Sequence, residues 1–337
     1  MITLKDISAR CGCSVATVSK ALNGMPDISA ETARHIRQVA QEMGYMPNAA
    51  ARTLKTNRSR TIGLIMFLKN ENVWTHDFFS QIAAGIQGVT EEKGYDITPI
   101  NAQKLVESNG LLSYCIHRGY DGLIVMSAGF EEKDVQELLS SRIPLVSIDH
   151  TFPGRSAVLS DNLQGTRELV RYAYSMGHRR IAFIHGEDTA VTQGRLQSFC
   201  AACKELSLNI PEEYIKPAIY HNMESAADAT RQLMVLENPP TCILYQDDYS
   251  CIGARNILER EGNPLPANVS VAGYDGTRLA ELFIPRLTTF RQNSEVIGQE
   301  AAHLLLNAIE NPQESYFRHL TIPGSLIIGE SVRQIKE

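Results

Sequence analysis

The stretch TLKDISARCGCSVATVSKALNG, residues 3–24, predicts two short helices joined by a tight turn. Thr3 is a side-chain cap for the first helix, and Asp6 follows at the position where an acid satisfies free amides and the positive helix end. Gly12 ends this helix, because glycine readily adopts the left-handed conformation that a helix stop needs. Ser14 then caps the second helix. Two helices in this arrangement form a helix-turn-helix, whose second helix lies against DNA.

The first turn of the second helix carries Val15, Ala16 and Thr17, which we expect to face outward. In a helix-turn-helix this turn enters the major groove, where small side chains approach base edges and thymine methyl groups. Ser19 and Lys20 are next to it and suit phosphate or guanine contacts. An ordinary helical hairpin is the alternative that this pattern alone leaves open.

Charge favours the DNA-binding interpretation. Residues 1–60 contain nine Lys or Arg and four Asp or Glu, a balance of +5. Since the whole chain carries −6, the remaining residues carry −11. A basic head on an acidic body suits phosphate binding by the head without general adhesion to nucleic acid.

Residues 47–60, PNAAARTLKTNRSR, form a candidate hinge. Pro47 and Asn48 open a stretch long enough for about two helical turns, which is marginal for an isolated helix in water. We expect it to fold only on DNA, where Leu54 would be buried as a wedge between base steps of the minor groove. A flexible basic linker is the alternative, and composition does not separate the two.

From residue 61 onward, short β-rich runs alternate with amphipathic helices, which is typical of parallel, doubly wound α/β sheets. The runs fall into two blocks, residues 61–161 and 162–289, and two more follow late in the chain. We therefore expect two similar lobes with a cleft between them. The predicted strands are IGLIMF, DITPI, GLIVMS, PLVSID, AVLSD, RIAFIHG, CILYQD, VSVAGYD and LTTF, followed by FRHLTIP and SLIIGE.

Ligands of open α/β sheets bind beyond the carboxyl ends of the strands. Polar and aromatic residues gather at those positions here. They are Trp74, Asp77, Phe78, Phe79, Ser127, Asp149, Gln246, Asp247 and Asp275, with Arg195 in the helix after RIAFIHG. Carboxylates and an arginine that bind hydroxyl groups, beside an aromatic face for the C–H side of a ring, describe a sugar pocket.

Each of these residues could instead stabilise the fold without binding a ligand. At least one of Phe78 and Phe79 is expected in the core of its own helix. Asp149 and Asp275 could cap the loops that follow them, and Arg195 could pair with a nearby acid. The coincidence of five such residues at strand ends favours the ligand site.

The run from TLKDISARCGCSVATVSKALNG through GYMPNAAARTLKT resembles the DNA-binding head and hinge of the lactose-repressor (LacI/GalR) family of bacterial transcription regulators. IGLIMF, DGLIVMS, MGHRRIAFIHG, GRLQSF and VAGYDGTRLAELFIPRLTTFRQ resemble the same family in the same order, so the resemblance covers essentially the whole chain. It implies a periplasmic-binding-protein-like core. It also implies that the segment after Leu287 crosses back to the first lobe, and that the end of the chain crosses again.

The resemblance implies roles for individual residues. Val15, Ala16 and Thr17 match the family's base-reading positions, and Leu54 matches the hinge leucine inserted at the centre of a palindromic operator. The expected DNA-binding residues are Thr3, Ser14, Val15, Ala16, Thr17, Ser19, Lys20, Asn23, Asn48, Arg52, Leu54 and Lys55. The expected effector-binding residues are Phe78, Phe79, Ser127, Asp149, Arg195, Gln246, Asp275 and Gln292.

Two departures from the family pattern prevent the ligand from being copied from any one relative. Gly276 follows the Tyr-Asp pair where the family often has a second acid or Asn, and Gln246 stands where Asn is frequent.

The predicted organisation is a helix-turn-helix domain over residues 1–46, a hinge over 47–60 and an effector-binding and dimerisation core over 61–337. Within the core, lobe 1 takes about 61–161 and 290–320, and lobe 2 takes about 162–289 and 321–337. The predicted function is a transcriptional regulator, a repressor by expectation, whose affinity for a palindromic operator is switched by a small molecule in the cleft. A sugar is the expected effector. A nucleobase or a phosphorylated partner protein is the alternative within the same fold.

Other classes of protein fit less well. The chain contains no GxSxG, no glycine-rich phosphate loop, no GxGxxG after a strand and no HExxH, so we expect no enzyme, no cofactor and no metal site. A glycoside-acting carboxylate pair, Asp149 with Asp275, is a remote alternative. An exported sugar receptor is disfavoured by the basic head and by an N-terminus unlike a signal peptide. We expect a cytoplasmic homodimer whose seven cysteines are reduced thiols.

Overall fold

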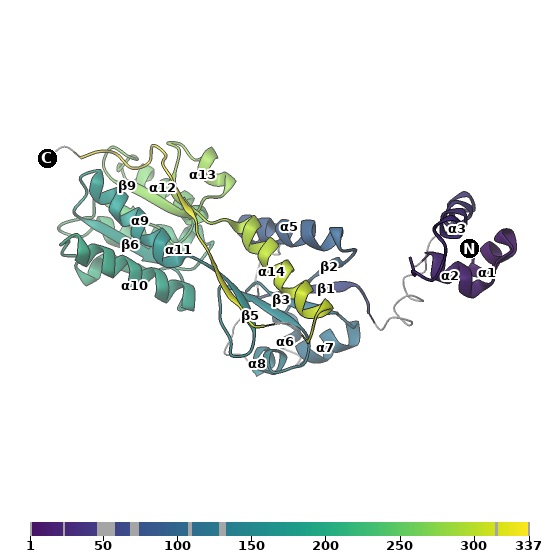
Figure 1. Cartoon of the computed structure of the whole chain (residues 1–337). Coiled ribbons are helices and arrows are strands. Elements are labelled where there is room, and N and C mark those ends of the chain that lie inside the picture. Colours follow the sequence, from purple (N-terminus) through teal and green to yellow (C-terminus); the bar gives the residue numbers. More distant parts are fainter. Residues whose placement is uncertain are drawn as a thin grey trace. The chain divides into compact units, whose positions relative to one another are not determined.

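The computed structural model describes residues 2–22, 24–45, 58–67, 74–106, 110–127, 133–313 and 316–335. The chain forms two compact units, Met1–Ser59 and Arg60–Glu337. The first contains helices α1 to α3, and the second contains every strand of the described residues (Figure 1).

The first unit is a three-helix head with α1 (Leu4–Cys11), α2 (Val15–Leu22) and α3 (Ala30–Glu42). Local signals set the helix ends. Thr3 and Asp6 form a reciprocal capping box, and Gly12 ends α1 with a φ of 64°. The backbone amide of Thr17 donates to Ser14 Oγ at 3.1 Å, so Ser14 caps α2. A small core of buried apolar side chains holds the three helices together, namely Ile7, Val18, Ala21, Ala33, Ile36, Val39 and Ala40.

The second unit contains two six-stranded sheets, one in each lobe. In lobe 1 the strand order is β11-β5-β4-β3-β1-β2, and every pair of neighbours is parallel. The strands are β1 (Thr61–Met66), β2 (Asp96–Asn101), β3 (Gly122–Val125), β4 (Leu145–Ile148), β5 (Ser156–Ser160) and β11 (His319–Ile322). The helices are α5 (Asp77–Glu92), α6 (Gln103–Val106), α7 (Leu111–Arg118), α8 (Lys133–Leu139) and α14 (Ser294–Glu310). Separate apolar clusters under α5 with α14 and under α7 with α8 bury the two faces of the sheet.

In lobe 2 the order is β12-β10-β9-β8-β6-β7, with only β12 antiparallel to its neighbour among the described strands. The strands are β6 (Ile181–His185), β7 (Ile215–Pro217), β8 (Cys242–Leu244), β9 (Ser270–Asp275), β10 (Thr288–Arg291) and β12 (Ser325–Ile327). The helices are α9 (Asn162–Ser175), α10 (Ala190–Glu205), α11 (Met223–Met234), α12 (Asp248–Arg260) and α13 (Arg278–Leu282), with a 3-10 turn at Glu212–Tyr214. One apolar cluster lies under α9 and α10 and another under α11 and α12.

The predicted fold class, an α-helical head followed by a two-lobed α/β core with parallel sheets, is confirmed. Every predicted strand is present. Sequence reasoning missed β7, whose three residues at a sheet edge carry no long apolar run. The predicted lobe boundary at residue 290 lies inside β10, because Thr288–Arg291 pair with β9 in the second sheet.

The chain crosses between the lobes at three places that lie next to one another. The first crossing follows β5 at Asp161, whose backbone amide donates to Ile322 O at 3.0 Å. The second lies between β10 and α14, where Asn293 Nδ2 donates to Pro323 O at 2.5 Å. The third joins β11 to β12 through Gly324, where a Cβ would come within 2.5 Å of Arg291 O. Since β5 and β10 both lead across at their carboxyl ends, the carboxyl edges of the two sheets face each other.

Candidate functional site

The head exposes the first turn of α2. Val15 is 40% exposed and Ala16 is exposed, whereas Val18, one turn later, is completely buried. Thr17 is half-buried, and its hydroxyl lies 2.8 Å from Ser14 Oγ. The turn predicted to read bases is therefore a surface of small side chains on a helix whose opposite face is fixed in the core.

Thr3 and Lys20, like Ser14 and Thr17, already have partners within the head. The Thr3 hydroxyl donates to Asp6 Oδ2 at 2.8 Å, and this hydrogen bond lowers the pKa of Asp6. Lys20 Nζ pairs with Asp27 Oδ2 at 2.5 Å, although both side chains are about half exposed. The Asp27 carboxylate therefore competes with a phosphate for the Lys20 ammonium. Ser19 is half-buried beside it.

The other predicted DNA-binding residues lie outside the described residues. They are Asn23, Asn48, Arg52, Leu54 and Lys55.

Arg195 is the central cation of the cleft. It extends from α10, is 3% exposed, and donates from Nε to Asn162 Oδ1 at 2.8 Å and from Nη1 to Gln246 O at 2.9 Å. Its guanidinium carbon lies 3.6 Å from the centroid of the Tyr274 ring. Burial acts to lower the pKa of Arg195, but the surrounding tyrosines and carboxylates outweigh it and raise the pKa. The guanidinium is therefore charged and held in one orientation.

Two carboxylates from opposite lobes lie near this cation. Asp149 follows β4 with a φ of 55°, and its carboxylate accepts from the Ser160 backbone amide at 2.6 Å and from the Ser160 hydroxyl at 3.2 Å. Asp275 ends β9 with a φ of 99° and accepts from Gln292 Nε2 at 2.7 Å. Burial raises the pKa of both carboxyls, that of Asp275 to about 6, while Arg195 opposes the increase.

Two glutamines each leave an acceptor without a partner. Gln246 is 1% exposed, and its Nε2 donates to Ile219 O and Ser250 Oγ. Gln292 is 5% exposed and donates to Asp275. The Oε1 atoms of both are buried without a hydrogen-bond partner in the part of the chain that is described. Buried unsatisfied acceptors are costly, so donors such as ligand hydroxyls would be favourable there.

The two predicted phenylalanines have different environments. Phe78 is 8% exposed and belongs to the apolar core of lobe 1. Phe79 is half-buried, and its ring lies 4.6 Å from the ring of His76. Only Phe79 therefore has the exposure and the polar neighbour expected of a cleft residue. Ser127 is half-buried after β3, and its carbonyl accepts from the backbone amide of Phe67.

Comparisons with known proteins identify the family of this chain. Residues 3–48 match the family model described as bacterial regulatory proteins, lacI family, and residues 170–332 match a periplasmic binding protein-like domain. The chain is 31% identical to the probable HTH-type transcriptional repressor ExuR of Bacillus subtilis (strain 168) over 340 residues, which cover 99% of both chains. The chain belongs to the LacI family.

Solved structures of LacI-family proteins share its fold. The transcriptional regulator CelR in complex with cellobiose matches with a TM-score of 0.75 and 26% identity, covering 98% of this chain and all of that one. The lac repressor dimer bound to operator and the anti-inducer ONPF has the same fold, with a TM-score of 0.82 and 23% identity over 98% and 99% of the two chains. This LacI-family chain is a ligand-responsive DNA-binding transcriptional regulator and not an enzyme.

Sequence reasoning missed several cleft residues of this LacI-family protein. Asn162, which fixes Arg195, directly follows the predicted strand AVLSD and could have been found by the same rule of strand ends. Tyr274 stands in the quoted VAGYD motif, but the sequence does not indicate that its ring underlies a guanidinium. His76, His221 and Tyr249 carry no sequence signal, because their rings meet only in the folded core.

The structure explains the glycine that departs from the family pattern. Gly276 has a φ of 65°, and a Cβ there would come within 2.5 Å of the Arg291 backbone. A larger residue would be strained and would push β9 away from β10.

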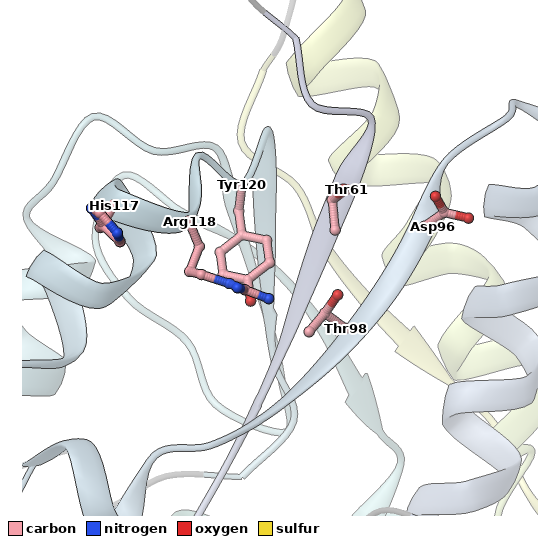
Figure 2. A pocket seen from close by; sticks show the side chains of 6 residues that line it. All are labelled: Thr61, Asp96, Thr98, His117, Arg118 and Tyr120. Carbon is pink, nitrogen blue, oxygen red and sulfur yellow. The ribbon is translucent and has the colours of Figure 1, made fainter. Parts of the chain in front are cut away.

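A separate hollow of about 390 Å³ lies outside the cleft, at the amino ends of β1 and β2 (Figure 2). Arg118 lies beside the Tyr120 hydroxyl there, and this contact raises the pKa of Arg118. Arg118 is also in the last turn of α7, where a cation complements the helix carbonyls. We assign the hollow no role in ligand binding.

Two further observations concern metal sites and membrane-spanning helices among the described residues. Among them, no three His, Cys, Asp or Glu side chains are arranged to hold a metal ion. Nor does any helix there have the length and apolar character needed to cross a bilayer.

Proposed function

We propose that this protein represses transcription as a homodimer at a palindromic operator and that a sugar in the interlobe cleft switches its affinity for DNA. The observation that carries the proposal is Arg195, a buried and fixed guanidinium beside carboxylates from both lobes. A ligand that contacts Asp149 and Asp275 together would change the angle between the lobes. It would shift the population of DNA-binding molecules by its differential affinity for the two states.

The polar groups of the cleft favour a neutral ligand rich in hydroxyl groups. Two carboxylates and two free amide oxygens supply acceptors, and Arg195 supplies donors in a planar fork. Phe79 adds an apolar face for the C–H side of a sugar ring. The cellobiose bound by CelR, at 26% identity over almost the whole chain, is in keeping with this class of ligand. We propose Phe79, Ser127, Asp149, Arg195, Gln246, Asp275 and Gln292 as the effector site.

A nucleobase is the second candidate. The stacked rings of His76, His221 and Tyr249 provide flat, partly polar surfaces that also suit a heterocycle. The acceptor-rich polar set fits a polyol better, because a base presents both donors and acceptors in one plane.

The head would read each half of the operator through the exposed first turn of α2. Val15 and Ala16 would contact base edges, and Lys20 would exchange Asp27 for a phosphate. Residues 47–60 would act as the hinge, with Leu54 inserted at the centre of the palindrome, as the sequence suggests. The protein would bind its operator DNA in the cytoplasm.

Dimerisation would use an apolar surface of lobe 2. Leu282, Ile284 and Ile328 are 66%, 71% and 55% exposed, so each leaves most of its apolar side chain available to a partner. The segments that carry Ile284 and Ile328 are joined by a hydrogen bond from Arg286 Nη2 to Ile328 O at 2.7 Å. A second copy of the chain would bury this surface and bring two heads to one palindrome.

Selection of the full-length protein against a randomised DNA library at low salt tests the proposal. We expect an enriched palindrome, and a gel shift with that palindrome whose midpoint moves when one sugar from a panel is added. If the protein binds DNA without sequence preference, whichever sugar of the panel is added, operator recognition is refuted. An enriched palindrome whose affinity responds only to nucleobases would replace the sugar by the second candidate.

A further inference from the structure

Three rings form a continuous stack that joins the two lobes of the core. His76 precedes α5 in lobe 1, His221 lies between β7 and α11 in lobe 2, and Tyr249 is in the first turn of α12. The His76 and His221 centroids are 4.2 Å apart with an interplanar angle of 19°. The His221 and Tyr249 centroids are 4.0 Å apart at 17°. These distances and angles are those of stacked aromatic rings.

The His76 ring has an aromatic neighbour in each lobe. Its ring lies 4.6 Å from Phe79 of its own lobe and 4.2 Å from His221 of the other. No side-chain hydrogen bond caps α5 at His76, and its Nδ1 is buried with no partner among the described residues. The ring contacts that hold His76 are therefore those with Phe79 in its own lobe and with His221 in the other.

The backbone around His221 is fixed by lobe 2. His221 has a φ of 55°, and its amide donates to Asp247 Oδ2 at 2.9 Å. Asp247 also accepts from the Ser250 amide at the start of α12, the helix that carries Tyr249. Hydrogen bonds within lobe 2 thus anchor the backbone of both His221 and the start of α12 to Asp247.

Electrostatics keeps the His76 ring neutral. Burial, assisted by the adjacent His221, lowers the pKa of His76 to about 3. Across the stack, His221 faces Asp275 and Asp247, while no carboxylate shifts the pKa of His76. The His76 side of the contact between the lobes is therefore uncharged at neutral pH.

We propose that the His76–His221–Tyr249 stack is a clasp that closes the cleft of the ligand-free protein, with His76 in the position that a ring-bearing effector must take. The second half of this proposal rests on the proposed function. If effector and His76 compete for one position, the apparent affinity for effector is the intrinsic affinity multiplied by the fraction of molecules that are unclasped. His76 would then set the minimum affinity that an effector needs in order to open the clasp.

The clasp is tested on the ligand-free, full-length protein by NMR of labelled histidine rings. We expect the wild-type His76 ring not to titrate between pH 5 and 8. In His221→Ala its pKa should rise from about 3 toward the ordinary value of 6.5. A wild-type His76 that titrates near 6.5 would show that the clasp does not form in solution.

Hydrogen exchange measures whether the clasp holds the lobes together. His76→Ala in lobe 1 should accelerate exchange of the amides around His221 in lobe 2 severalfold, and His221→Ala should do the same around the start of α5. His221→Phe keeps a stacking ring and should retain protection. His303→Ala, at an exposed histidine of α14, is the matched control and should change neither region.

Unchanged exchange around His221 in a folded His76→Ala protein would overturn the proposal. Since neither operator nor effector enters these measurements, failure of the clasp leaves the proposed function standing. Failure to find a sugar effector leaves the clasp standing in turn.

Discussion

The Arg195 guanidinium lies over the Tyr274 ring, with 3.6 Å between the guanidinium carbon and the ring centroid. Tyr274 is 2% exposed and immediately precedes Asp275, so the cation and the carboxylate of the cleft are positioned by neighbouring residues of one strand. The ring supports the guanidinium from one face, while Asn162 and Gln246 fix it in the plane.

Arg195→Lys should therefore abolish the effector response although it keeps the charge. An ammonium cannot hold Asn162 and Gln246 O while presenting a planar fork, so we expect effector affinity to fall by about thirtyfold or more. Operator affinity without effector should be unchanged in a gel shift. Arg171→Ala, at an exposed arginine of α9, is the control. A normal effector response in Arg195→Lys would remove Arg195 from the site.

Lys20→Ala should weaken operator binding and lower the slope of log affinity against log salt by about one, because one phosphate contact is lost. Asp27→Asn should have the opposite effect, since it removes the ion pair that holds Lys20 in the free head. Fluorescence anisotropy over a salt series measures both slopes. An unchanged slope in Lys20→Ala would mean that Lys20 does not contact the backbone.

Leu54→Ala should weaken binding to the palindrome by about tenfold and leave effector binding unchanged, because the wedge at the central base step is lost. The residue lies outside those that the structure describes, so this prediction comes from the sequence. Calorimetry with effector and gel shifts with operator separate the two properties. Equal operator affinities for variant and wild type would favour a simple linker.

Asp275→Asn should stabilise the ligand-free core at neutral pH. Burial raises the pKa of Asp275 from 3.8 to about 6, so the native state binds more protons than the unfolded state between these values. Stability is therefore lost as pH rises from 3.8 to 6 and stays lower above 6. We expect a gain on the order of 1 kcal/mol at pH 7 by urea denaturation. A variant less stable than wild type at pH 7 would contradict this explanation.

His178 should give stability the opposite pH dependence. Its ring is fully buried between Thr241 Oγ1 and Arg333 O, and burial lowers its pKa from 6.5 to about 4. The unfolded state therefore binds the extra proton as pH falls from 6.5 to 4, and stability falls with it. His178→Gln should flatten this part of the curve in urea titrations. The same slope in both proteins would exclude His178 as its source.

The chain's local patterns account for most of its organisation. Capping at Thr3 and Ser14 and the stop at Gly12 depend on residues within a turn of one another, so the first two helices of the head could be predicted almost to the residue. The alternation of apolar strands and amphipathic helices fixed the α/β class in the same way. Edge strand β7 was missed because its three residues carry no strand pattern of their own. Their extended conformation depends on pairing with β6.

The candidate site was only partly predictable. The rule of strand ends identified Asp149, Arg195 and Asp275, because parallel sheets bring strand ends together whatever the details of packing. It did not separate Phe78, which packs into the core, from Phe79, which contacts His76. That difference depends on which side of α5 meets the sheet.

By itself, then, the sequence determined the helix-turn-helix, the two parallel sheets and the polar residues at their carboxyl edges, since these follow from short-range caps and periodicity. Only the tertiary structure decided that Lys20 is paired with Asp27, that Arg195 lies over Tyr274 and that His76 meets His221 across the cleft. The last of these contacts joins residues 145 positions apart in different lobes. Its geometry depends on the packing of both sheets, which no local pattern of residues encodes.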